Sequence, residues 1–208
     1  DKSGVFLIQA RSAMENIQDL MGSVELDKLR AAADTLAHAR KVVLIGATSG
    51  MALGSYFCCM ASMAFDNWRT AGTDGAFWAS EMAKLGPEDA VFVVSLQPYG
   101  TRPVHAAEIA RDAGAAMIAI TDSLQSPYAG IATNCFVVKA EGPQFFPSHV
   151  APLVLIEGLM GMVVRRAGKT AVDRIRSTEL MAHELQEYWV NYPSSHLQRK
   201  KYDTTSTP

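Results

Sequence analysis

The sequence has few cysteines and no metal or disulfide pattern among them. Cys58 and Cys59 are adjacent, Cys135 stands alone, and no Cys-x-x-Cys or Cys/His spacing accompanies them. Disulfide frameworks and thiolate metal sites both depend on regular cysteine spacing, so we expect neither. We interpret the three residues as buried thiols in a reducing, cytoplasmic compartment, and we expect no bound metal and no cofactor.

The sequence also lacks an excess of charge of either sign. Its 208 residues include 19 Lys and Arg against 21 Asp and Glu, which gives a net charge of −2. Binding to DNA or to an anionic membrane needs clustered basic side chains, so this chain is not expected to hold nucleic acid by itself. No apolar run reaches the ~20 residues of a membrane span, and no signal peptide is recognisable. The chain begins at Asp1 without Met, so we expect it to be part of a longer protein.

Short apolar runs alternate with helical patterns from residue 41 onward. Strands are expected at residues 42–45, 68–71, 90–95, 117–121 and 136–138, and helices between them at 51–65, 76–84, 104–113 and 126–132. Short, nearly uniformly apolar strands separated by helices imply a parallel sheet that is covered on both faces. The predicted fold class is therefore α/β, a doubly wound parallel sheet of about five strands flanked by helices.

Helical patterns also flank the predicted sheet on both sides. We expect N-terminal helices within residues 1–40, a ligand-binding domain at 41–168, an amphipathic C-terminal helix at 169–192 and a flexible tail at 193–208. The segment 150–164 is apolar around most of its circumference, so a helix there needs a covering surface. We expect a homo-oligomer, at least a dimer.

The first predicted strand ends in "GATSG", residues 46–50, which are small residues and hydroxyls. This stretch lacks the second and third Gly of a dinucleotide fingerprint and the Gly-Lys-Ser/Thr of a P-loop, so a nucleotide is disfavoured. Thr48 and Ser49 suit a single phosphate or a sugar hydroxyl. The alternative is that one of them only caps the following helix.

A second strand end reads "VSLQPYGTRPVH" and brings together Ser95, Gln97 and Thr101. In open parallel sheets, ligands bind beyond the carboxyl ends of the strands, near helix N-termini. Capping needs one polar residue for each helix, so the excess of neutral hydrogen-bonding groups favours a polyhydroxylated or phosphorylated ligand. At the third strand end, "ITDSLQSPYA", we interpret the polar side chains, including Asp122, as capping residues.

The order of these motifs resembles the sugar isomerase (SIS) domain. The most specific segments are "ITDSLQSP" and "FPSHVAPLVLIEGL", and the resemblance is strongest to the ligand-binding half of RpiR-type bacterial transcription regulators. It implies binding of a phosphosugar or a related small acid, dimerisation through helices around the site, and DNA contact through a helix-turn-helix domain that is absent from this chain. The resemblance implies ligand contacts from six side chains, those of Thr48, Ser49, Ser95, Gln97, Thr101 and Ser148.

The sequence departs from the family pattern in both loops. Thr48 stands where the family usually has Gly, and Gly50 stands where it usually has Ser. The second loop has "SLQPYGTR" in place of the Ser-x-Ser-Gly-x-Thr typical of phosphosugar binders. The ligand therefore stays open among a sugar phosphate, a sugar acid, an unphosphorylated sugar and another small polar metabolite.

An enzyme is the main alternative to a sensor. Aldose–ketose isomerisation needs a proton-transfer group, and His149 and Glu157 are the nearest candidates in the sequence. They are eight residues apart in a predicted helical region, which puts them two turns from one another. We expect no catalytic residue and favour a small-molecule sensor, with an SIS-type isomerase or a non-catalytic sugar-binding module as alternatives.

Overall fold

The computed structural model describes residues 2–46, 48–72 and 77–189 of the chain. Its elements are α1 (Lys2–Ser23), α2 (Leu26–His38), β1 (Val42–Ile45), α3 (Thr48–Ser62), β2 (Trp68–Thr70), α4 (Trp78–Met82), β3 (Ala90–Ser95), α5 (Thr101–Asp112), β4 (Ala116–Thr121), β5 (Asn134–Val137), α6 (Val150–Ala167) and α7 (Lys169–Glu184). The predicted tail at 193–208 lies outside the described residues.

The five strands form one sheet in the order β2-β1-β3-β4-β5, and every pair is parallel. This confirms the predicted α/β fold. The helix predicted at residues 126–132 is wrong, because that segment is a series of turns. Within it, the N–H of Ala129 donates to the carbonyl of Ser126 and that of Ile131 to the carbonyl of Tyr128, which are the three-residue spacings of turns.

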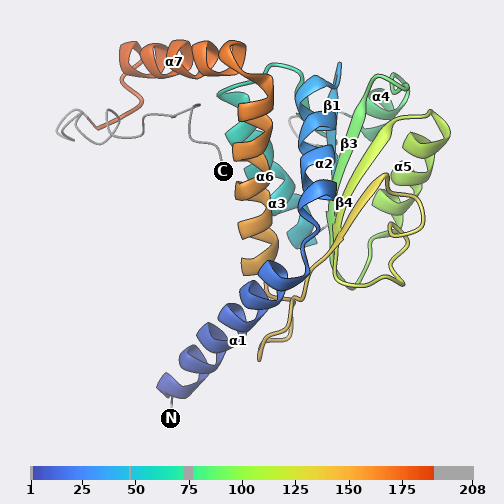
Figure 1. Ribbon diagram of the computed structural model, residues 1–208, viewed down its shortest axis with the longest axis vertical. Helices are drawn as coiled ribbons and strands as arrows, with labels where there is room; N and C mark the ends of the chain where they lie inside the picture. The colour runs from blue at the N-terminus through green and yellow to red at the C-terminus, as the bar shows by residue number, and fades with distance from the viewer. Residues whose placement is uncertain (1, 47, 73–76, 190–208) are drawn as a thin grey trace.

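Alternate residues of each strand face the two sides of the sheet. Leu44, Phe92 and Ile118 belong to one buried cluster, whereas their chain neighbours Val43 and Val91 belong to the other. This follows from the two-residue period of a strand. Helices α2, α3 and α6 lie on the first face, which the C-terminal end of α1 also reaches, and α4 and α5 lie on the second (Figure 1). Both faces are covered, which is why the strands read as unbroken apolar runs.

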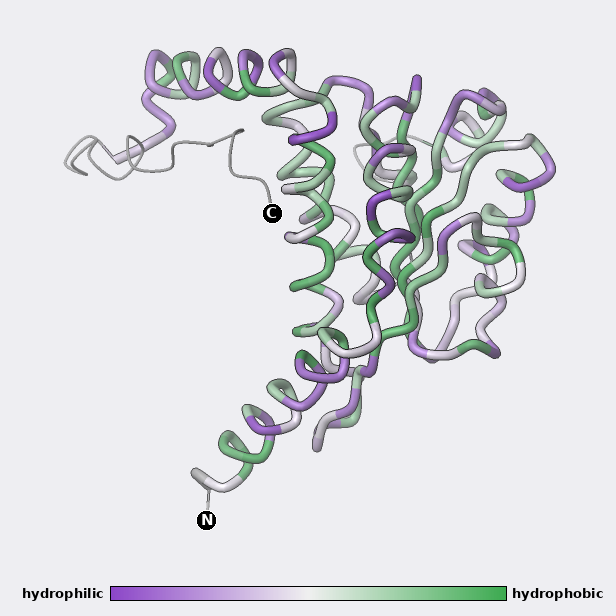
Figure 2. Tube along the Cα trace, in the orientation of Figure 1, coloured by the Kyte–Doolittle hydropathy of each residue, from purple (hydrophilic) through white to green (hydrophobic). Residues whose placement is uncertain are grey.

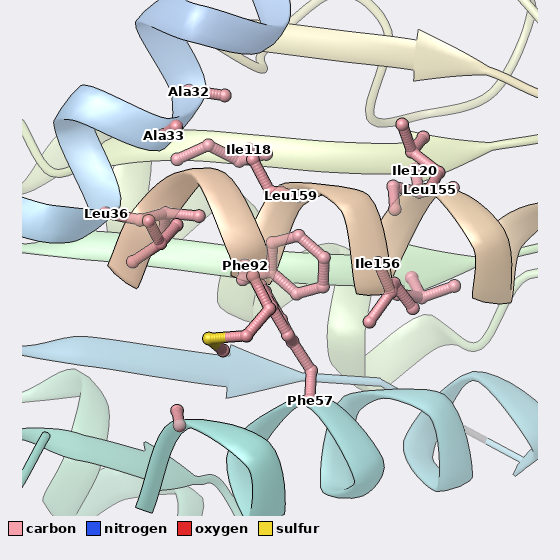
Figure 3. Packing of buried hydrophobic residues seen from close by; sticks show 14 of the residues in the cluster. Ala32, Ala33, Leu36, Phe57, Phe92, Ile118, Ile120, Leu155, Ile156 and Leu159 are labelled. Carbon is pink, nitrogen blue, oxygen red and sulfur yellow. The ribbon is translucent and has the colours of Figure 1, made fainter. Parts of the chain in front are cut away.

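The larger core lies between the sheet and helices α2, α3 and α6 (Figure 3). The Phe57 ring of α3 lies 4.5 Å from the Phe92 ring of β3 and 5.0 Å from the Trp68 ring of β2, measured between ring centroids. Leu36 of α2 and Ile156 of α6 are also fully buried there. Aromatic pairs at such distances add to the stabilisation from burial. This core fixes the ends of α3 and α6 relative to the sheet.

Helices α1 and α7 extend away from the body of the protein (Figure 1). Figure 2 shows hydrophobic stretches along the projecting part of α1. Four consecutive apolar side chains of α1, Val5, Phe6, Leu7 and Ile8, are each more than half exposed. Helix α7 ends at Glu184, earlier than the 192 expected from the sequence, and Gln186 follows it with a φ of 56°.

The expectation of three buried thiols is wrong for one of them. All three cysteines are free, but Cys59 is exposed and Cys58 and Cys135 are half-buried. The buried side of α3 carries Leu53, Phe57 and Ala61, and Cys59 lies about 200° around the helix from Phe57, so it faces away from the core. Separately, no helix among the described residues is long and apolar enough to cross a membrane.

The first turn of α3 lies very close to the end of β3. A Cβ placed on Gly50 would lie 2.1 Å from the carbonyl oxygen of Val94, which is backbone and cannot move aside. A Cβ on Gly46 would lie 2.9 Å from the backbone nitrogen of Met51. Both positions therefore require glycine, and the contact at Gly50 joins the two loops in which the sequence predicts the site.

We predict that Gly50→Ala destabilises the protein by roughly 2–3 kcal/mol, because the added methyl overpacks a backbone contact. Gly161→Ala is the matched control, since Gly161 lies in α6 with no atom near its missing Cβ. That change is expected to be neutral or stabilising by up to about 1 kcal/mol, the usual helix preference for Ala over Gly. Urea unfolding monitored by circular dichroism measures both. Equal effects of the two variants would contradict the proposed close contact.

Candidate ligand-binding site

The predicted site residues gather at the carboxyl edge of the parallel sheet. Strand β1 ends at Ile45 and α3 begins at Thr48. Strand β3 ends at Ser95 and α5 begins at Thr101. Because β1 and β3 are neighbours, their two loops lie side by side. Topological switch points of this kind are where open α/β sheets bind ligands. In this sheet β1 has β2 on one side and β3 on the other, so the direction of strand order reverses between β1 and β3.

In the first loop, Thr48 and Ser49 are exposed at the start of α3. No hydrogen bond to either hydroxyl is formed within the described residues, so the simple capping interpretation has no support there. Thr48 has a φ of 50°, in the left-handed region that favours glycine and disfavours β-branched residues. The backbone at Thr48 therefore has a conformation that suits Gly, the residue that the resemblance leads us to expect at this position.

In the second loop, the three predicted residues differ in exposure. The Ser95 side chain at the end of β3 is buried, and Gln97 and Thr101 are exposed. Thr101 is the first residue of α5, and its neighbour Gly100 at the N-cap supplies no side-chain cap. Helix N-termini without side-chain caps offer free N–H groups to a ligand. Ser49, Ser95, Gln97 and Thr101 thus belong to two adjoining loops.

Asp122 holds the second loop in place. The sequence interpretation, which made Asp122 a capping residue, missed this role. Oδ2 of Asp122 accepts a hydrogen bond from the Gln97 backbone N–H at 3.0 Å, and its Oδ1 accepts one from the Tyr99 hydroxyl at 2.7 Å. Asp122 therefore caps no helix but ties the end of β4 to the loop that follows β3. This contact could not be predicted from the order of the motifs, because residues 97 and 122 are brought together only by strand pairing.

Tyr99 of the second loop packs against Tyr128. The Tyr99 and Tyr128 rings meet edge to face with centroids 6.2 Å apart. Burial raises the pKa of the Tyr128 phenol, and the Ser95 side chain partly offsets that rise. Burial and the hydrogen bond to Asp122 raise the pKa of the Tyr99 phenol. Both phenols are therefore neutral near pH 7 and act as hydrogen-bond donors or packing groups, not as bases.

Ser148 lies at the same edge of the sheet, just before α6. Its backbone N–H donates to the Ala140 carbonyl at 2.8 Å, and its side-chain oxygen is buried with no hydrogen-bond partner among the described residues. Ser148 makes no hydrogen bond to the two loops. A buried hydroxyl without a partner is costly, and such an atom at a site is a candidate for contact with a ligand.

The two candidate catalytic residues are not brought together. His149 precedes α6, and burial lowers its pKa while the Pro147 carbonyl partly offsets this effect. Glu157 lies two turns further along α6 and accepts a hydrogen bond from the Tyr56 hydroxyl of α3 at 2.9 Å. Glu157 is exposed and engaged with that neighbouring helix. The arrangement supplies one neutral histidine and no carboxylate beside it.

An open hollow lies between the α1–α2 turn and β5. It has a volume of about 540 Å³ and includes Asp122 and Lys139 in its lining, but none of the six predicted ligand contacts. Its lysines are already paired, Lys139 with Asp19 at 2.6 Å and Lys28 with Glu25 at 2.8 Å. We keep the two strand-end loops as the candidate site because they adjoin at the carboxyl edge of the sheet, at its switch point, and present exposed hydroxyls at the starts of α3 and α5. Across the described residues, no group of three His, Cys, Asp or Glu side chains could hold a metal ion.

The sequence model of the SIS domain matches residues 35–161. This chain belongs to the SIS domain family. The match begins in α2 and ends in α6, so it includes the whole parallel sheet and both loops of the candidate site. No curated protein matched the chain.

Several solved structures share the fold. The sugar isomerase domain of an RpiR transcription factor from Sphaerobacter thermophilus is 22% identical, with a TM-score of 0.76 over 86% of this chain and 97% of that one. Vibrio vulnificus NanR, complexed with ManNAc-6P, is 20% identical with a TM-score of 0.74 over 86% of this chain and 68% of that one. A Methanococcus jannaschii protein, whose structure infers a function as 3-hexulose-6-phosphate isomerase, is 15% identical with a TM-score of 0.63 over 79% and 93%. The SIS fold thus occurs in regulators and in isomerases alike.

Proposed function

We propose that this SIS domain is the small-molecule sensing domain of a bacterial RpiR-type transcription regulator in the cytoplasm. Its ligand is a sugar phosphate, a sugar acid or a related small polar metabolite, and DNA contact belongs to a domain outside this chain. The observation that carries the proposal is the pair of adjoining loops rich in neutral hydrogen-bonding groups, with no acid–base pair beside them. The regulator domains among the structural neighbours, one of them with ManNAc-6P, support it.

Neutral donors and acceptors suffice for a sensor. A regulator needs only different affinities for its ligand in two conformations, a coupling of about 1–3 kcal/mol. The hydroxyls of Ser95 and Thr101, with the backbone N–H groups at the start of α5, can supply this without any perturbed acid or base. An isomerase, in contrast, needs a group that moves a proton at the sugar carbon.

We predict that a small polar metabolite binds the two loops and that Ser95→Ala or Thr101→Val weakens it. Each change removes one hydrogen bond, worth about 1 kcal/mol, so we expect roughly a fivefold loss of affinity. A thermal-shift screen of sugars, sugar phosphates and sugar acids identifies the ligand, since ligands that bind the folded state raise its melting temperature. Calorimetry then measures the variants.

The matched control for Thr101→Val is Thr170→Val, because Thr170 is exposed in α7, away from the two loops. The affinity of Thr170→Val for the ligand is expected to equal that of the wild type. Unchanged affinity in both Ser95→Ala and Thr101→Val would place the ligand elsewhere and end this assignment of the site.

An SIS-type isomerase is the second candidate, and one observation favours it. The Nε2 atom of His149 is buried with no hydrogen-bond partner among the described residues, so it is free to meet a substrate. The lowered pKa of His149 keeps the ring neutral near pH 7, as a general base requires. What the arrangement lacks is a second convergent group for ring opening and proton return.

We predict that the domain leaves its best ligand unchanged on prolonged incubation, as followed by NMR of the isomer composition. A sensor has no reason to accelerate proton transfer, whereas loss of a general base costs an isomerase about 10²-fold or more in rate. The wild type and His149→Ala are therefore expected to give the same spectra, as is Glu157→Gln. Isomerisation by the wild type that either variant abolishes would instead establish the enzyme.

We further propose that the protein is a homodimer whose interface includes α1. One turn of α1 presents only apolar side chains, Val5 to Ile8, so no side of that turn faces water favourably. The same helix is tied to the loop before α6, because the Asn16 side chain donates to the Glu141 carbonyl at 2.7 Å. That loop carries Phe145 and Phe146, also exposed, so the apolar surface continues from α1 toward α6.

We predict a dimer in sedimentation velocity at tens of micromolar, and dissociation by the double change Phe6→Glu with Ile8→Glu. Two buried charges without partners strongly disfavour an apolar interface. Ile109→Glu is the control, because Ile109 is half exposed on α5, on the opposite side of the sheet. Circular dichroism verifies that each variant is folded. A wild-type monomer, or dissociation of the control alone, would contradict this interface.

A further inference from the structure

The loop between β3 and α5 offers few free N–H groups to an anion. Pro98 of this loop and Pro103 in the first turn of α5 have no N–H, so two of the seven residues from Gln97 to Pro103 cannot donate from the backbone. A third N–H, that of Gln97, already donates to Oδ2 of Asp122 at 3.0 Å. Phosphate cradles in proteins depend on several converging backbone N–H groups. This loop has fewer of them than its position at a helix start would provide.

The Asp122 carboxylate is an anion that the protein itself places against the loop between β3 and α5. It is held by the Gln97 N–H and by the Tyr99 hydroxyl at 2.7 Å, and the Thr121 hydroxyl lies 3.5 Å from its Oδ1. The side chain is half-buried, so it is fixed in position and not dispersed in solvent. The chain thus places its own carboxylate against a backbone donor that an anionic ligand would otherwise use.

The basic side chains nearby do not cancel this fixed charge. Lys28 and Lys139 line the same hollow as Asp122, but they pair with Glu25 and Asp19. Arg102, in the first turn of α5, is exposed, so its charge is well solvated. The charge held in place against the loop, by the Gln97 N–H and the Tyr99 hydroxyl, is therefore the negative charge of Asp122.

We propose that Asp122 determines specificity, so that the loop between β3 and α5 takes an uncharged, hydroxyl-bearing group of the ligand and disfavours a phosphate. A hydroxyl can donate to the remaining lone pairs of the carboxylate, whereas a phosphate meets a like charge in a partly desolvated place. The inference rests on the proposed function, in which these two loops bind a small polar metabolite. Within that proposal it selects the unphosphorylated class.

The test compares Asp122→Asn with Asp112→Asn. Both remove one negative charge, but Asp112 is exposed at the end of α5 and pairs only with Arg111 among the described residues. Asn retains the size of Asp and one acceptor oxygen. The probes are inorganic phosphate and the pair glucose and glucose 6-phosphate, measured by NMR shifts of backbone amides, with the Thr101 amide as the local reporter.

We expect millimolar inorganic phosphate to leave the Thr101 amide of the wild type and of Asp112→Asn unshifted. We expect Asp122→Asn to bind phosphate about tenfold more tightly than either, with the shift at Thr101. We also expect the ratio of affinities for glucose 6-phosphate and glucose to rise about tenfold in Asp122→Asn. Equal phosphate binding by the two variants would overturn the inference.

The wild type alone provides a second test that does not depend on the fold of any variant. Inorganic phosphate that shifts the Thr101 amide of the wild type at millimolar or lower concentration would also overturn the inference, while leaving the proposed function standing. Failure of the proposed function looks different. In that case no metabolite of the screen shifts either loop, and the comparison of the two variants with inorganic phosphate still decides the role of Asp122.

Discussion

The contact between the first turn of α3 and the end of β3 is the constraint on which the candidate site depends. The backbone of Gly50 approaches the Val94 carbonyl so closely that no side chain fits between them. Because of this approach, the β1–α3 loop and the β3–α5 loop adjoin, and hydroxyls from separate parts of the chain share one edge of the sheet. The contact itself is held by the core beneath it, where Phe57 of α3 packs on Phe92 of β3.

A second constraint acts across the neighbouring strand pair. Asp122 at the end of β4 reaches the loop after β3 and binds both Gln97 and Tyr99. The shape of that loop is thus set by a side chain 25 residues away in sequence. The same carboxylate brings a negative charge to the loop in which the sequence predicts ligand contacts. One residue therefore links the geometry of the site to the kind of ligand that we propose for it.

The sheet was predictable from the sequence, because a strand buried on both faces must be apolar at nearly every position. The runs ending at Ile45, Ser95 and Thr121 all proved to be strands at nearly the predicted bounds. Helix prediction failed at residues 126–132, where Ser126 and Pro127 begin a series of turns. Burial of Cys59 was also mispredicted, since an apolar stretch does not reveal which side of its helix meets the core.

The sequence by itself determined the fold class, the two loops that border the site and five of the residues in them, because local patterns of apolar and small residues specify strands and tight turns. It also determined the balance of charge, a net charge of −2 with no overall excess of basic residues. Only the tertiary structure decided that Asp122 holds the second loop, that Glu157 is engaged by Tyr56 away from His149, and that Ser148 keeps a buried hydroxyl without a partner among the described residues. The physical reason is that these contacts join residues far apart along the chain, and their distances are set by strand pairing and core packing.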